Sequence, residues 1–113
     1  MKLENTRAQM RKGVLELCIL SIISEGEAYP SDIIKKLKEH ELIIVEGTLY
    51  PLLTRLKNTG LLGYNWKEST SGPPRKYFHI TEKGLEFLKG LLDTWDRLVN
   101  AVSQSTKNLI DNE

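Results

Sequence analysis

Apolar residues recur in alternating steps of three and four through the last part of the chain. The series runs Leu85, Leu88, Leu92, Trp95, Val99, Val102, Thr106 and Leu109, with one polar interruption. This spacing is typical of a helix with a continuous apolar seam, and about 29 helical residues would extend for about 43 Å. Residues 1–81 are too few to cover such a seam, so the pattern predicts a partner helix. A second copy related by twofold symmetry supplies it most simply.

Two helices are predicted in the first 40 residues. Residues 7–24 become apolar on nearly every side in their second half, which indicates a central helix that is covered all round. Pro30 begins a second helix that continues to about His40. The run ELIIVEG that follows contains a short segment with β-strand character.

A third helix is predicted at residues 48–59, although a proline lies among its leucines. Thr48 is suited to be the N-cap, which puts Pro51 at the third helical position, where its missing N–H removes no hydrogen bond. The proline ring crowds the carbonyl of Gly47, and glycine accommodates this best. Gly60 then ends the helix.

A β-hairpin and a last helix complete the predicted order. LGYNWKES and RKYFHI are two expected strands, and TSGPP between them is a turn. Thr81 caps the last helix. Three helices followed by a hairpin form a winged helix-turn-helix. The predicted fold is therefore α+β and mainly α, with a winged helix-turn-helix DNA-binding domain at residues 1–81 and a C-terminal dimerisation helix at 82–113.

Positive charge is concentrated in the third helix and the hairpin. The whole chain has a net charge of +1, but residues 48–81 hold five cations against one acid, a net +4, and residues 82–113 hold four against six, a net −2. Arg55 and Lys57 alone would fit a solvated helix face better than a DNA contact; the hairpin cations favour a polyanion. The expected groove contacts are Thr48, Tyr50, Thr54 and Arg55; the expected phosphate contacts are Lys57, Arg75 and Lys76, with Lys67 in the same basic hairpin.

Catalysis and membrane insertion have little support in the sequence. His40 and His79 have no nucleophile or carboxylate at a telling spacing, and there is no Gly-rich phosphate loop or metal motif. We therefore expect no enzyme activity and no cofactor. Cys18 is the single cysteine and reads as a small buried hydrophobe. Glu16 interrupts the first apolar run, which is too short to span a bilayer. The prediction is a cytoplasmic protein without a membrane partner.

The segments GTLYPLLTRLKNTGLL and GPPRKYFHITEKG, with Trp66 between them, resemble the core signature of the PadR family of bacterial transcriptional regulators. The resemblance covers roughly residues 10–95 and includes Tyr29; the single C-terminal helix is similar to that of the smaller PadR subfamily. It implies a homodimeric winged-helix repressor that binds operator DNA, often beside an efflux or stress gene that it controls.

The resemblance also implies a ligand site at the centre of the dimer. In multidrug-binding members, a tryptophan of the C-terminal helix stacks on planar ligands, and Trp95 has the matching place. The other residues that the resemblance puts around this chamber are Met10, Gly13, Leu17, Leu92 and Val99. Val99 stands where some drug-binding relatives have an acid, and the leucines of GVLELCILSII add bulk that could fill the chamber. Trp95 would fit an ordinary core or interface position as well.

Two functions follow as hypotheses. The first is a dimeric DNA-binding transcriptional regulator, a repressor released by a planar hydrophobic effector. The alternative is a winged-helix protein-interaction module without DNA binding. The salt dependence of duplex binding distinguishes them, because neutralising phosphates makes affinity fall steeply with salt.

Overall fold

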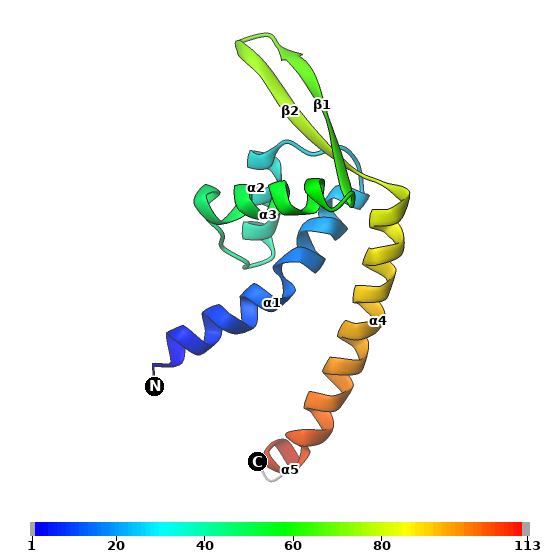
Figure 1. Cartoon of the computed structure of the whole chain (residues 1–113). Coiled ribbons are helices and arrows are strands. Elements are labelled where there is room, and N and C mark those ends of the chain that lie inside the picture. Colours follow the sequence, from blue (N-terminus) through cyan, green and yellow to red (C-terminus); the bar gives the residue numbers. More distant parts are fainter. Residues whose placement is uncertain (1, 112–113) are drawn as a thin grey trace.

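The computed structural model describes residues 2–111. Its elements are α1 (Leu3–Ser24), α2 (Pro30–Glu39), α3 (Glu46–Asn58), β1 (Leu62–Ser69), β2 (Gly72–Ile80), α4 (Glu82–Ser105) and the short α5 (Lys107–Asp111) (Figure 1). The two strands form an antiparallel hairpin, which we call the wing. The order and the mainly helical class confirm the predicted winged helix-turn-helix.

The core lies where α1, α2 and α3 meet beneath the wing. Its most deeply buried side chains are Ile19, Leu20, Ile23, Ile33, Leu37, Leu49 and Leu53. They recur at helical spacing, so each helix turns one apolar face inward. The prediction that α1 is covered all round is wrong for the single chain, because Leu17, Cys18 and Ile22 are only half-buried. The first part of α1 extends away from the other helices in Figure 1.

Helix α3 begins earlier than predicted. Its N-cap is Val45, whose carbonyl accepts from the backbone N–H groups of Thr48 (3.0 Å) and Leu49 (3.1 Å). Thr48 is therefore inside the first turn and not the N-cap, and Pro51 is inside the helix. The acceptor that loses its partner at Pro51 is the carbonyl of Gly47, four residues earlier, and the glycine leaves room for the ring.

The segment between α2 and α3 is a loop and not the β-like run predicted for ELIIVEG. Ile44 is buried, while Ile43 is 75% exposed and Val45 is 65% exposed. This alternation is typical of a strand, but a strand also needs a neighbour for its backbone groups. Within residues 2–111 the only paired strands are β1 and β2, so the loop has no partner.

The wing is attached to the helical core at its base. Phe78 and Ala28 form an isolated bridge, in which the N–H of Ala28 donates to the Phe78 carbonyl (3.0 Å) and the N–H of Phe78 donates to the Ala28 carbonyl (2.8 Å). The predicted turn TSGPP is shorter than expected, because β2 starts at Gly72 and includes both prolines. They are exposed near the end of the hairpin, where a proline removes no needed hydrogen bond.

Helix α4 starts as predicted and ends sooner. The Thr81 hydroxyl accepts from the N–H of Gly84 (3.0 Å) and donates to the carbonyl of Gly60 (2.7 Å), which confirms it as the N-cap. The helix breaks at Thr106, so Leu109 belongs to α5 and the single long helix of the prediction is wrong there. The Thr106 hydroxyl donates to the Val102 carbonyl (2.8 Å).

Candidate nucleic-acid interface

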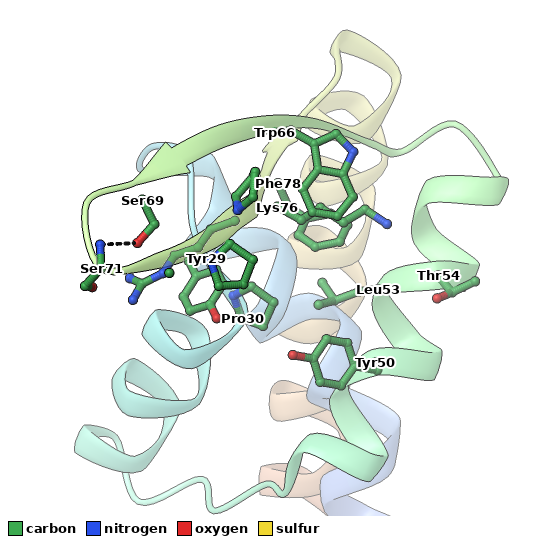
Figure 2. A pocket seen from close by; sticks show the side chains of 14 residues that line it. Tyr29, Pro30, Tyr50, Leu53, Thr54, Trp66, Ser69, Ser71, Lys76 and Phe78 are labelled. Atoms are coloured by element: carbon green, nitrogen blue, oxygen red, sulfur yellow. Dashed lines mark hydrogen bonds between the residues drawn. The ribbon is translucent and has the colours of Figure 1, made fainter.

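A groove with a volume of about 440 Å³ lies between α3 and the wing. Tyr50 and Thr54 enter it from α3, and Trp66 lies across from them on β1 (Figure 2). Arg75 and Lys76 of β2 also line it, and none of the described lining residues is acidic. A phenol is protonated at neutral pH even at its ordinary pKa, and burial raises the pKa of Tyr50 further, so its hydroxyl can donate a hydrogen bond. The groove thus combines donors and cations.

Aromatic rings hold the cations of α3 and the wing. The Nζ atom of Lys76 is 4.0 Å from the centroid of the Tyr64 ring, and the Nζ atom of Lys57 is 5.3 Å from the same centroid. The guanidinium of Arg75 lies 4.9 Å from the centroid of Tyr29, at the start of α2. These contacts restrict long side chains that would otherwise be mobile on the surface.

Lys67 differs from the other cations because an acid neutralises it. It forms an ion pair with Glu27, and it also lies 5.0 Å from the centroid of Tyr77. The hydrogen bond between the two side chains lowers the pKa of Glu27 and raises that of Lys67. The ion pair of Lys67 therefore connects the wing to the segment before α2.

Two of the predicted groove residues lie elsewhere on α3. Arg55 forms an ion pair with Glu16 of α1, and both line a separate cavity with Lys83 and Phe87. Thr48 lines a third cavity, of about 510 Å³, between α1 and the start of α3. Of the eight predicted residues, the groove brings together Tyr50, Thr54, Arg75 and Lys76, and Lys57 approaches it through Tyr64.

Sequence reasoning missed the aromatic residues of this site, namely Tyr29, Tyr64 and Trp66. A signal for two of them was present. Side chains two apart on a strand share a face, so Tyr64 and Trp66 lie on one side of β1. The antiparallel register places Lys76 opposite Trp66 and Phe78 opposite Tyr64. A strand with aromatic residues at alternate positions, paired with a strand that carries a lysine, predicts contacts between the lysine and the rings.

The predicted effector residues are only partly brought together. Gly13, Leu17 and Trp95 line a small cavity of about 80 Å³ between α1 and α4. Leu17, Leu92 and Trp95 line an adjoining cavity of about 250 Å³. Met10 and Val99 line neither cavity and are 71% and 44% exposed.

The part of the chain that the structure describes has neither a cluster of metal-ligating side chains nor a helix that could span a membrane. It contains no group of three or more histidine, cysteine, aspartate or glutamate side chains placed to hold a metal ion. Within residues 2–111, no helix has both the length and the apolar character needed to cross a membrane. Burial raises the pKa of the Cys18 thiol, which disfavours a reactive thiolate.

Comparison with known proteins identifies the family. The model of the transcriptional regulator PadR-like family matches residues 19–90. A PadR-like transcription factor from Bacteroides fragilis is 58% identical, with 88% of this chain and 97% of that chain covered and a TM-score of 0.75. A PadR family transcriptional regulator from Eggerthella lenta is 34% identical, with 90% and 89% covered and a TM-score of 0.84.

A more distant structure, Bacillus subtilis PadR in complex with operator DNA, has the same fold. It is 24% identical, with 70% of this chain and 47% of that chain covered and a TM-score of 0.65. The family match extends over α2, α3, the whole wing and the start of α4, and so includes the groove. The chain therefore belongs to the PadR-like family of transcriptional regulators.

Proposed function

We propose that the protein binds operator DNA as a homodimer through α3 and the wing, and represses transcription. The observation that carries this proposal is the groove, where hydrogen-bond donors of a helix and cations of a hairpin converge without an acid among the described lining residues. A helix entering the major groove with a wing on the adjacent backbone is a known arrangement for this fold. The operator complex of Bacillus subtilis PadR supports the proposal at the level of the fold.

The placement of the side chains suggests separate roles. Tyr50 and Thr54, exposed on α3, are proposed to reach base edges. Lys57, Arg75 and Lys76 are proposed to contact phosphates, which position the protein without reading sequence. Further proposed contacts are Thr48, in the first turn of α3, Arg55 and Lys67. Arg55 would have to leave Glu16 to reach a base, and Lys67 would have to leave Glu27 to reach a phosphate.

Duplex binding at several salt concentrations tests this function. We expect the parent protein to bind DNA taken from the region flanking its own gene, with affinity that falls steeply as salt rises. Lys76→Ala should weaken binding to every duplex and flatten the salt slope by about one. Lys89→Ala is the matched control, because it removes an exposed lysine of α4 that lies outside the groove. Affinity that is absent or independent of salt would instead favour the protein-interaction module.

We also propose that a planar aromatic effector binds between two Trp95 side chains of the dimer and releases the DNA. Trp95 supports this because it is 42% exposed. It also lines both the cavity of about 80 Å³ and the adjoining cavity of about 250 Å³. Two facing indole rings would stack on a flat ligand, with about 0.5–1.5 kcal/mol per aromatic pair beyond the burial of area.

Fluorescence tests the effector site directly. In a Trp66→Phe variant, Trp95 is the remaining tryptophan. Planar dyes should quench its emission saturably at one site per dimer, and the same titration should reduce operator binding. A nonplanar compound of similar size is the control. If every planar compound leaves Trp95 emission unchanged, the proposed chamber is filled by protein side chains.

A further inference from the structure

We propose that Tyr64 joins Lys57 of α3 and Lys76 of the wing into one clamp for a phosphate of the DNA backbone. Tyr64 acts as a positioning residue, and the two lysines bind the phosphodiester. The inference rests on the proposed DNA binding and adds to it a defined anion site shared by the two elements.

The geometry places both cations at one aromatic ring. The Nζ atoms of Lys57 and Lys76 lie 5.3 Å and 4.0 Å from the Tyr64 centroid. They can therefore be no more than 9.3 Å apart, the sum of these two distances. Lys57 comes from the last turn of α3 and Lys76 from the second strand of the wing. A single ring thus connects the two elements that are proposed to hold DNA.

The environment keeps the ring in place. Tyr64 is half-buried, with Trp66 edge-on at a centroid distance of 6.3 Å and Phe78 tilted at 6.1 Å. Phe78 is itself buried and bridged to Ala28 at the base of the wing. A ring that is packed in this way restrains the two long lysine side chains before DNA binds. They then lose less conformational entropy on binding.

The charges at this ring are uncompensated, which points to an anionic ligand. Neither lysine forms an ion pair with any residue in the described range. Each cation is attracted by the electron-rich face of the ring, but the two ammonium groups repel each other. A phosphate between them would relieve this repulsion and accept a charge-assisted hydrogen bond from each.

The opposite face of the wing shows that a lysine over a tyrosine need not leave its charge free. Lys67 lies 5.0 Å from the Tyr77 centroid and is paired with Glu27. The same type of contact therefore occurs twice in one hairpin, once with an acid present and once, at Tyr64, with a second lysine. The two lysines at Tyr64 have no acid beside them, so this site is the one that fits a polyanion.

Double-mutant cycles test the clamp, with Lys57→Met and Lys76→Met made in the parent, in Tyr64→Phe and in Tyr64→Leu. Phenylalanine keeps the ring face, so Tyr64→Phe should bind duplex DNA within about twofold of the parent. Tyr64→Leu should lose about five- to tenfold in affinity. Each lysine substitution should then cost much less affinity in the Tyr64→Leu background than in the parent. Lys89→Met, which replaces an exposed lysine of α4 outside the groove, is the control, with the same small effect in every background.

A second measurement does not depend on whether Tyr64→Leu folds. In the parent, the effects of Lys57→Met and Lys76→Met on affinity should be non-additive, because both side chains bind one phosphate. Thermal unfolding of each variant shows whether the wing is intact. Additive effects of the two lysines, or equal lysine effects with tyrosine and leucine at position 64, would overturn the clamp while DNA binding stands. A parent that does not bind duplex DNA would overturn both proposals.

Discussion

Single residues decide how the wing is held, and Lys67 with Glu27 is the clearest case. The pKa of Glu27 is lowered from 4.5, first by the hydrogen bond from Lys67. A carboxyl group with a lowered folded-state pKa stabilises the fold above its unfolded-state pKa, and this contribution is lost as the pH falls through the folded value. Lys67 has a pKa raised from 10.5, so its contribution is lost only as the pH rises beyond that value.

The lowered pKa of Glu27 predicts how the stability of the ion pair changes at acid pH. Lys67→Met should lower the melting temperature at neutral pH, and the difference from the parent should shrink as the pH falls below about 4.5. Glu27 of the unfolded chain becomes protonated first, and Glu27 of the folded protein, with its lowered pKa, becomes protonated only at lower pH. Thermal unfolding followed by circular dichroism from about pH 6 to pH 3 measures it. Lys35→Met, which replaces an exposed lysine of α2, is the control. A difference that persists undiminished at pH 3 would contradict the ion pair.

At the same scale, the sequence could identify which residue types lie near the groove but not their partners. Tyr50 and Thr54 were found because helical periodicity separates an exposed face from a buried one. The pairing of Arg55 with Glu16 depends on how α1 crosses α3, which no local pattern encodes. The aromatic support of Lys76 became visible only with the register of the hairpin.

At the scale of elements, alanine substitutions at two glycines of α4 should change the free energy of unfolding in opposite directions. A Cβ atom at Gly84 would lie 2.1 Å from the carbonyl oxygen of Leu61 and 2.6 Å from Cγ1 of Ile80. Helix and wing base would have to separate, so Gly84→Ala should lower the free energy of unfolding by about 1–3 kcal/mol. A Cβ atom at Gly90 meets nothing within 4 Å, and Gly90→Ala should raise it by about 0.5–1 kcal/mol.

Urea denaturation of the two variants and the parent gives both values. The pair is matched, because each variant adds the same methyl group to the same helix. If Gly84→Ala is as stable as the parent, the close contact between α4 and the Leu61 backbone is wrong.

Element boundaries were predicted where local chemistry decides them. Gly60 follows α3 with a φ of 81°, a conformation that glycine adopts at low cost, and the Thr81 hydroxyl caps α4. The start of α3 was missed because Val45 caps through its backbone alone and has no capping side chain. The break at Thr106 was missed because the apolar spacing continues to Leu109 across it.

The whole molecule is elongated, with extents of 58 × 30 × 22 Å. The cause is α4, which packs against the core at Leu88 and Leu91 and then continues away from the wing (Figure 1). Its apolar side chains Leu92, Trp95, Val99 and Val102 are between 42% and 57% exposed. Such a stripe on a single chain is typical of an interaction surface, and a second copy would cover it through a twofold contact.

The dimer is tested by placing one charge on the stripe and one beside it. Val99→Glu puts a carboxylate where the proposed interface is apolar, at a cost of several kcal/mol if it is buried without a partner. Asn100→Glu adds the same charge to the next position, which the apolar stripe does not include. In sedimentation at micromolar concentration we expect dimers for the parent and Asn100→Glu, and monomers for Val99→Glu.

Because two recognition helices must be about 34 Å apart to enter successive turns of one duplex face, Val99→Glu should also lose most operator affinity with its groove unchanged. A parent that sediments as a monomer would remove the dimer, and with it the shared chamber at Trp95.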